Sequence, residues 1–336
     1  MKSEGQGGYR AGQLKRWLYQ RRADSFADMT DLPAGLREQL EGEFAFWTTT
    51  VSKHQTSDDG TEKILLALRD GGEVECVLLR DGDRRTICVS SQVGCAMGCV
   101  FCASGLDGVD RNLTAGEILE QMLRLQRLLP DDERLSHIVM MGMGEPLANL
   151  DNVLQALDVA SDEKGLGISP RRITISTVGL PPAMDRLTST NPRYHLAVSL
   201  HAPNDKLRDE LVPVNNKTGL TKIVEAADRY FETSGRRLTF EYVLLAGIND
   251  HIDQAEELAQ LLKGRPALLN VIPYNPVDGL PYQTPSALAI RKFREVLERN
   301  HITVKFRQRK GDEINAACGQ LRRLNAAESR TTKVTK

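Results

Sequence analysis

Three cysteines lie close enough together in this sequence to bind one metal centre. Cys95, Cys99 and Cys102 fall within eight residues. Cysteine thiolates in such a run are the usual ligands of iron–sulfur clusters, and they also bind zinc. A zinc site needs further ligands, commonly about 15–20 residues on, and residues 115–125 contain neither Cys nor His. The spacing therefore indicates an iron–sulfur cluster with three protein ligands, which leaves one iron open to bind a small molecule.

The rest of the sequence favours a reducing compartment for this centre. The first ten residues lack the apolar stretch of a secretory signal, and no run approaches the roughly 18 apolar residues of a membrane span. We therefore expect a cytoplasmic protein with no membrane partner. Disulfide frameworks are rare in that compartment, so clustered cysteines there bind metal or do chemistry.

Strands and helices alternate along residues 85–300, and this order positions the cysteine run. Serial β-α units predict a parallel sheet, either doubly wound or curled into a partial (β/α)6 barrel. The cysteine run follows the first strand, so it should lie at the carboxyl edge of the sheet, where barrels build their sites. Strands are expected at 86–91, 137–142, 172–177, 194–200, 238–245 and 267–273. Amphipathic helices are expected near 115–129, 150–162, 180–188, 220–234, 251–263 and 286–299.

Two extensions precede this α/β unit and one follows it. Residues 10–47 are predicted to be helical because Leu14, Trp17 and Leu18 recur at helical spacing. Strands at 61–69 and 73–80 around a central Asp-Gly-Gly predict a β-hairpin. The expected parts are a helical accessory domain (1–55), a β-hairpin extension (56–84), the barrel (85–300), and a final strand with a mobile C-terminal segment carrying Cys318 (301–336).

The net charge of −1 conceals two basic ends. Residues 1–22 carry six Lys and Arg against one Glu, and residues 301–336 carry nine against three acidic residues. Basic ends on an acidic body suit an anionic partner, although solvated tails would have the same composition. The side chains expected to contact phosphates are Arg16, Arg21, Arg22, Arg322 and Arg323.

The cysteine run resembles the signature of the radical SAM superfamily. The gaps of three and two residues, with the aromatic Phe101 before the last cysteine, are typical of that signature. The resemblance implies two cofactors, a 4Fe-4S cluster and S-adenosylmethionine (SAM). It implies that the open iron binds the amino and carboxylate groups of SAM, and that one electron then splits SAM to give a 5′-deoxyadenosyl radical.

Longer motifs resemble the RlmN/Cfr family of RNA adenine methyltransferases over nearly the whole chain. Val109 departs from the family pattern, which has an aromatic residue there. Stretches at 9–11 and 29–33 resemble the branch that methylates adenine C2. The other matching stretches are 88–95, 111–113, 141–146, 199–205, 273–276 and 311–320.

The resemblance assigns roles to individual residues at the ends of the expected strands. Cys95, Cys99 and Cys102 are implied to bind the cluster. The residues implied to line the SAM pocket are Gly144, Glu145, Ser176, Ser199, Leu200, His201 and Asn275.

Three further residues carry the implied methyl transfer. Adenine C2 is a poor nucleophile, so ordinary polar transfer from SAM should fail there. By resemblance, Cys318 is methylated first and its methylene radical adds to the ring carbon. Cys88 then attacks the Cys318 sulfur and releases the product as a disulfide forms. Glu75 matches the glutamate that removes the ring proton, and it shares one face of its strand with Val77 and Leu79, so we expect apolar surroundings, which suit a proton acceptor. The alternatives are a free tail thiol for Cys318 and a solvated edge-strand carboxylate for Glu75.

The resemblance implies a SAM-dependent enzyme that methylates C2 of a specific adenosine in 23S rRNA and of an anticodon-loop adenosine in tRNA, through a methylcysteine intermediate, with residues 1–55 as an RNA-binding accessory domain. Methylation of C8 of the same rRNA adenosine is the alternative within the family. A non-catalytic RNA-binding module held by metal is the alternative from another class. An electron donor such as flavodoxin is the further partner implied, and a monomer is expected.

Overall fold

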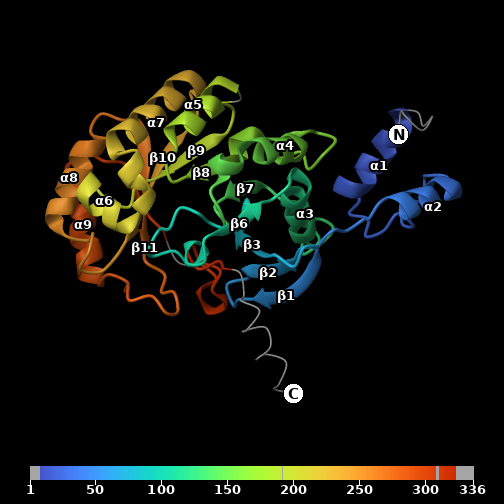
Figure 1. The fold of residues 1–336 in the computed structure, drawn as a ribbon, viewed down its shortest axis with the longest axis horizontal. Coiled ribbons are helices and arrows are strands. Elements are labelled where there is room, and N and C mark those ends of the chain that lie inside the picture. Colours follow the sequence, from blue (N-terminus) through green and yellow to red (C-terminus); the bar gives the residue numbers. More distant parts are fainter. Residues whose placement is uncertain (1–7, 191, 308–309, 323–336) are drawn as a thin grey trace, which may run out of the picture.

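One curved sheet runs through the molecule, and the computed structural model describes it within residues 8–190, 192–307 and 310–322. Ten described strands lie side by side in chain order (Figure 1). The first three, joined by antiparallel pairing, are β1 (Thr50–Thr56), β2 (Glu62–Ala67) and β3 (Glu73–Asp81). The remaining seven, β4 (Arg84–Cys88), β7 (His137–Met140), β8 (Ile173–Thr177), β9 (His195–Ser199), β10 (Leu238–Leu244), β11 (Ala267–Pro273) and β12 (Val304–Phe306), are mutually parallel.

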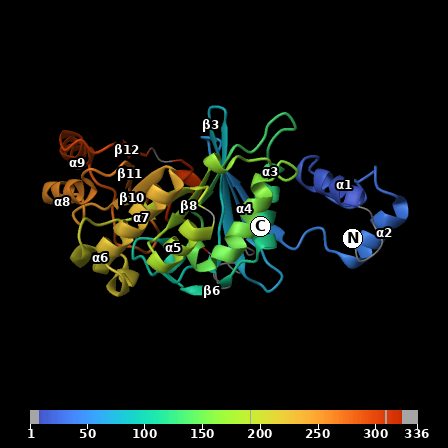
Figure 2. The same ribbon diagram turned by 90° about the horizontal axis from the view of Figure 1, so that it is seen from above.

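Amphipathic helices cover the outer side of the parallel strands (Figures 1 and 2). Each buries one apolar stripe against the sheet, as Ile223, Val224 and Tyr230 do in one of them. The arrangement confirms the predicted α/β partial barrel. The covering helices are α3 (Ala115–Gln126), α4 (Leu150–Ser161), α5 (Pro181–Thr190), α7 (Leu220–Ser234), α8 (Ile252–Leu262) and α9 (Ala287–Arg299).

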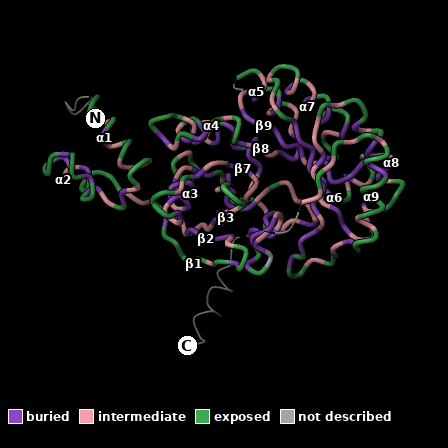
Figure 3. The backbone as a smooth tube through the Cα atoms, turned by 180° about the vertical axis from the view of Figure 1, so that it is seen from behind, coloured by how far each residue is buried: buried purple, intermediate pink, exposed green. Residues whose placement is uncertain are grey.

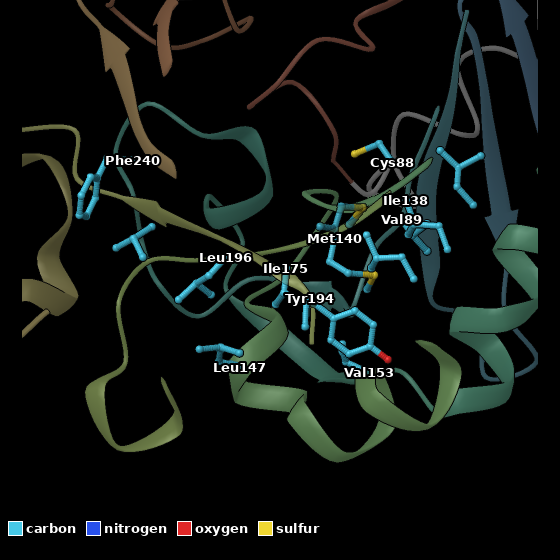
Figure 4. Packing of buried hydrophobic residues seen from close by; sticks show 14 of the residues in the cluster. Cys88, Val89, Ile138, Met140, Leu147, Val153, Ile175, Tyr194, Leu196 and Phe240 are labelled. Carbon is cyan, nitrogen blue, oxygen red and sulfur yellow. The ribbon is translucent and has the colours of Figure 1, made fainter. Parts of the chain in front are cut away.

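The main core lies between these helices and the strands, and the buried backbone in Figure 3 follows the strands. Ile138, Met140 and Ile175 point to the helix side and pack with Val153 of α4 (Figure 4). Cys88 belongs to the same cluster of buried residues. The core therefore fixes the strand ends from which the site residues project.

Strand β1 was not predicted. All but its last residue falls inside the range assigned to the helical accessory domain, yet it pairs with β2 along the edge of the sheet. Its residues, Thr-Val-Ser-Lys-His-Gln-Thr, are almost all exposed, so neither face carries the apolar alternation by which strands are recognised. Polar residues are common on edge strands, where they discourage pairing with other chains. The expected β-hairpin is therefore part of a three-stranded antiparallel extension.

The N-terminal helices, α1 (Gly8–Tyr19) and α2 (Ala34–Glu43), form a small unit beside α3 (Figures 1 and 2). The unit has its own apolar cluster, which includes Met29 and Leu36. The Arg22 guanidinium donates to the carbonyl oxygens of Leu129 and Pro130 at 2.8 and 2.9 Å. Arg22, expected to contact RNA phosphates, therefore fastens this unit to the barrel instead.

Several short elements were also missed because they offer little periodicity. These are β5 (Gln92–Gly94), β6 (Val109–Asn112) and α6 (Asp205–Leu211). Strands β5 and β6 pair with each other and enclose the cysteine run. No helix in the described part of the chain is both long enough and apolar enough to cross a membrane.

Candidate active site

The residues expected to carry the chemistry reach one edge of the parallel sheet. Cys88 is the last residue of β4, Ser176 is the last but one of β8, and Ser199 is the last of β9. Gly144 follows β7, and Asn275 follows β11. Because parallel strands all end at the same edge, these side chains surround the mouth of the partial barrel.

The three clustered cysteines lie on the loop between β5 and β6. Backbone hydrogen bonds hold the loop, from the Cys95 N–H to the Gly108 carbonyl at 2.8 Å and from the Cys102 N–H to the Cys99 carbonyl at 3.1 Å. Gly94 has a φ of 76°, and a Cβ there would lie 2.1 Å from the Gly108 oxygen. Only glycine permits the loop to close at this point.

The thiols of this loop are near enough to affect one another's ionisation. Burial raises the pKa of Cys95 to about 12, and the Cys102 thiol adds to this. Burial also raises the pKa of Cys99, and Cys102 and Cys95 add to that shift. Within the described chain, no three Cys, His, Asp or Glu side chains already surround one point as metal ligands. The donor set nonetheless fits a cluster: three free thiols on one loop, which would lose their protons on binding iron.

Glu145 lies beneath this loop as a buried carboxyl. Its two oxygens accept hydrogen bonds from the Leu147 N–H at 3.0 Å and from the Val178 N–H at 2.7 Å. Burial raises the pKa of Glu145 to about 7, and these hydrogen bonds oppose the shift. The preceding Gly144 has a φ of 99°, and a Cβ there would lie 2.6 Å from the Gln92 Cβ. The glycine thus lets this turn pack directly against the cysteine loop.

His201 is buried and uncharged. Its Nδ1 accepts a hydrogen bond from the Val243 N–H at 3.1 Å, so the ring proton belongs on Nε2. Burial lowers the pKa of His201 to about 3, and the nearby Arg208 charge adds to this. The ring meets Phe101 of the cysteine loop edge-on, with centroids 4.9 Å apart. A neutral imidazole here can donate one hydrogen bond to a bound ligand.

Arg208 holds the carbonyls next to His201 in place. Its Nε donates to the Leu200 carbonyl at 2.9 Å, and its Nη2 donates to the Ser199 carbonyl at 2.8 Å. The side chain is completely buried, and burial lowers the pKa of Arg208 to about 10. The expected SAM-pocket residues Ser199 and Leu200 therefore owe their backbone position to an arginine that sequence reasoning did not select.

Two buried oxygens at this edge have no hydrogen-bond partner among the described residues. They are Oδ1 of Asn275 and Oε2 of Glu241 in β10. Buried polar atoms are normally paired, so an unpaired acceptor suggests a ligand that donates to it. Asn275 and the neutral His201 together fit a polar cofactor such as SAM.

Cys88 and Cys318 line the same cavity, of about 390 Å³. Both are free thiols. Burial raises the pKa of Cys88 to about 12, Cys318 adds to this, and the Arg307 charge opposes it. The pKa of Arg307 is raised, chiefly by Cys318. Four cationic side chains line this cavity: Arg84, Lys305, Arg307 and Lys310.

The described part of the segment that carries Cys318 is fastened at several points. The Cys318 carbonyl accepts from Asn275 Nδ2 at 3.1 Å, and the Gly319 carbonyl accepts from the Ala103 N–H of the cysteine loop at 2.8 Å. Gln320 donates to the Pro276 carbonyl at 2.8 Å. This part of the segment, expected to be mobile, is therefore docked against both the cysteine loop and the end of β11.

Glu75 does not line the cavity of the two cysteines. It lines a second cavity, of about 190 Å³, with Lys63 and Arg322. Its Oε1 lies 2.8 Å from Lys63 Nζ, and its Oε2 accepts from the Arg322 N–H at 2.9 Å. The expected apolar surroundings of Glu75 were wrong, because the facing strand presents a lysine. Residues of the Cys318 segment line both cavities.

Sequence reasoning missed four charged residues at this edge, although weak signals existed. Lys63 interrupts the apolar run of β2, and Glu241 lies between two buried aromatic residues of β10. A charge in an otherwise buried strand is unusual and suggests a specific partner. Arg208 and Arg307 had no such local signal. Arg323 lies outside the described residues.

Comparison with known proteins places this geometry in a family. Residues 89–262 match the radical SAM superfamily, whose members use a 4Fe-4S cluster and SAM. Residues 1–45 match the ribosomal RNA large subunit methyltransferase N-terminal domain.

Individual relatives agree over almost the whole chain. A probable dual-specificity RNA methyltransferase RlmN from Rhodopirellula baltica is 70% identical over 99% of this chain and 90% of its own. The dual-specificity RNA methyltransferase RlmN from Geobacter sulfurreducens is 47% identical over 94% of this chain and 86% of its own. The crystal structure of a radical SAM methyltransferase from Sphaerobacter thermophilus, 44% identical, superposes with a TM-score of 0.93 over 96% of this chain and 95% of its own. The chain belongs to the radical SAM superfamily and, within it, to the RlmN family of RNA methyltransferases.

Proposed function

We propose that this enzyme methylates C2 of an adenosine in 23S rRNA and of an adenosine in the anticodon loop of tRNA. The observation that carries the proposal is the pairing of Cys88 and Cys318 in one cavity next to the loop of three cysteines. Two free thiols in one cavity suit a covalent intermediate that one thiol forms and the other resolves.

The residues of the chain divide this chemistry between them. When bound, the 4Fe-4S cluster and SAM supply the methyl group and a 5′-deoxyadenosyl radical. Cys95, Cys99 and Cys102 would hold the cluster, and Asn275 and His201 would orient SAM. Cys318 carries the methyl group to the adenine and becomes joined to it through a methylene bridge.

Release of the product needs a second thiol and a base. Glu75 accepts the ring proton of the adduct, and the remaining unpaired electron would return to the cluster. Cys88, as a thiolate, attacks the Cys318 sulfur, so a disulfide forms as the bond from sulfur to the methylene carbon breaks, and that carbon takes up a proton to become the methyl group. Reduction of the disulfide, by a cellular thiol system, restores both cysteines for the next turnover.

RNA as the substrate is supported by the cations of the large cavity. Lys305, Arg307 and Lys310 line it beside Cys318, and phosphate groups are bound chiefly by such side chains. The relatives' names specify dual-specificity RNA methyltransferases, which supports two classes of RNA. A protein that modifies ribosomal and transfer RNA works in the cytoplasm; we propose a monomer that receives electrons from a donor such as flavodoxin.

The choice between C2 and C8, and between the two RNAs, can be tested in one experiment. Purified, anaerobically reconstituted enzyme is incubated with SAM, a reductant and either 23S rRNA or tRNA, and the nucleosides are separated by mass spectrometry against synthetic standards. We expect 2-methyladenosine from both RNAs. 8-Methyladenosine would overturn the site of methylation, and product from only one RNA would overturn dual specificity.

A further inference from the structure

Lys63 is the buried partner of Glu75. Its side chain is 7% exposed and that of Glu75 is 8% exposed, and the two charged atoms lie 2.8 Å apart. In the register of β2 and β3, Lys63 faces Val77 while Leu65 faces Glu75. Lys63 and Glu75 are therefore diagonal neighbours on one face of the hairpin, within reach of a long side chain.

The same ammonium group also reaches the segment that carries Cys318. Lys63 Nζ donates to the Asn315 carbonyl at 3.0 Å. At the other end of that segment, the Arg322 N–H donates to Glu75 Oε2 at 2.9 Å. The ion pair thus holds the chain three residues before Cys318 and four residues after it.

A buried ion pair needs a reason, because removing two charges from water is unfavourable unless both are well paired. Here the pair connects two groups that must act together in the proposed reaction: Glu75, which accepts the proton, and the segment of Cys318, which carries the methyl group. Oε1 of Glu75 accepts from the Lys63 ammonium group and Oε2 accepts from the Arg322 N–H, and each oxygen has a second lone pair that can take the ring proton.

We propose that Lys63 is a positioning residue of the methyl transfer: it aligns Glu75 for removal of the ring proton and fixes the position of that carboxylate relative to Cys318 through the Asn315 carbonyl. This inference rests on the proposed function. Lys63 touches neither SAM nor the adenine. It acts after the methylene bridge to the RNA has formed, when the ring proton must leave before the product can be released.

The hairpin offers a matched control on its opposite face. Arg80 of β3 pairs with Glu62 of β2 at 2.5 Å, and this pair is also a diagonal neighbour. The Arg80 side chain otherwise donates to the Gly60 and Leu128 carbonyls, and among the described residues it makes no hydrogen bond or ion pair with the segment that carries Cys318. Arg80→Met therefore removes an ion pair from the same two strands without disturbing the site.

The experiment measures three steps in the reconstituted holoenzyme with tRNA. Intact mass reports methyl loading of Cys318, chromatography reports 5′-deoxyadenosine, and a denaturing gel reports covalent RNA–protein adduct. We expect Lys63→Met to load the methyl group and to make 5′-deoxyadenosine as the unmodified enzyme does. It should accumulate adduct and release methylated RNA at least tenfold more slowly, as Glu75→Gln should.

Two further variants separate positioning from folding. Lys63→Arg keeps the charge and the reach, so it should restore most of the release rate. Lys63→Met/Glu75→Gln leaves no lone buried charge, and it should release RNA no more slowly than Glu75→Gln alone. Deuterium at C2 of the target adenine should slow release further in Lys63→Met.

The outcomes distinguish this inference from the proposed function. If Lys63→Met behaves as Arg80→Met does, with normal release and no adduct, Lys63 has no positioning role. If the losses of release rate from Lys63→Met and Glu75→Gln add up in the double variant, the two residues act independently, and Lys63 again has no positioning role. If the unmodified enzyme neither loads Cys318 nor forms an adduct in Cys88→Ala, the proposed function itself fails.

Discussion

The side-chain amide of Asn275 donates a hydrogen bond of 3.1 Å to the main-chain carbonyl of Cys318. Asn275 follows β11 at the carboxyl edge of the sheet, and Cys318 lies on the C-terminal segment. The contact joins the expected SAM pocket to the expected methyl carrier. The other amide atom, Oδ1, is buried without a partner in the described chain and so is available to a ligand.

Replacement of Asn275 by Ala should slow methylation about tenfold or more. A buried hydrogen bond whose partner is left unsatisfied is worth roughly 1–3 kcal/mol, and about 1.4 kcal/mol corresponds to a factor of ten. Asn275→Asp should be no better, because an ionised carboxylate cannot donate to the Cys318 carbonyl. Initial rates of RNA methylation check this. Unchanged rates in both variants would mean that the contact does not position Cys318.

The two cysteines of the large cavity should fail at different steps. Cys318→Ala should keep its cluster yet make no methyladenine, because no thiol remains to carry the methyl group. Cys88→Ala should load the methyl group and attack the adenine, and then stall with Cys318 joined to RNA, because no thiolate displaces its sulfur. A denaturing gel should show the adduct with Cys88→Ala and none with the double variant. Normal turnover by Cys88→Ala would contradict its resolving role.

Resolution of that adduct should accelerate as the pH rises. Burial raises the pKa of Cys88 to about 12, so near neutral pH the thiol is almost entirely protonated. Below that pKa the thiolate fraction increases about tenfold per pH unit, and only the thiolate attacks. Rapid-quench measurements on the Cys88-containing enzyme between about pH 6 and 8 should therefore show adduct decay with this slope.

Arg307 provides the control for this pH dependence. Its charge lowers the pKa of Cys88, so Arg307→Met should raise that pKa and slow adduct decay at every pH, while Arg307→Lys should stay closer to the unmodified enzyme. A decay rate that does not change with pH would show that thiolate formation at Cys88 does not limit release.

The parts of the fold that could be predicted are those with a local signal. The strands of the barrel are short apolar runs, as in Ile138–Met140 and Ile173–Ile175, and burial on the helix side demands such residues. Strand β1 has no comparable pattern, since its residues are nearly all exposed. Whether these residues form a strand depends on β2, with which they pair, and a short stretch of sequence around β1 does not include β2.

The residues of the site also divide into those that a local pattern reveals and those whose contacts come from distant parts of the chain. Cys95, Cys99 and Cys102 lie on one loop, so their spacing alone indicated a shared ligand. The contact between Glu75 and the Arg322 N–H joins residues 247 positions apart in the chain. Local patterns carry no information about such a contact, which explains why the surroundings of Glu75 were predicted wrongly.

The metal content separates an enzyme from a structural zinc module. Anaerobically purified protein should be brown and contain about four irons per chain, as one cubane cluster requires. Replacing Cys95, Cys99 or Cys102 by Ala should remove the colour, whereas Cys76→Ala, which alters a buried thiol of the main core, should retain it. Metal analysis and the visible absorption spectrum check both. Stoichiometric zinc without iron would contradict the assignment of an iron–sulfur cluster to these cysteines.

The N-terminal unit should contribute to RNA binding through its exposed arginines. Arg16 and Arg21 are exposed on and next to α1, whereas Arg22 is fastened to the barrel through the Leu129 and Pro130 carbonyls. Each phosphate contact adds roughly 0.7–0.9 to the slope of log affinity against log salt. Arg16→Ala/Arg21→Ala should therefore reduce that slope by about 1–2 in tRNA binding measured by fluorescence anisotropy.

Arg22→Ala is the control for these two arginines, because it removes a positive charge from the same unit at a residue that does not face solvent freely. Its hydrogen bonds hold the unit on the barrel, so its loss should lower the free energy of unfolding by roughly 1–3 kcal/mol and leave the salt slope almost unchanged. Denaturant unfolding and the same anisotropy titrations check this. If instead Arg22→Ala lowers the slope and Arg16→Ala/Arg21→Ala does not, the RNA phosphates meet a face of the molecule other than the exposed side of α1.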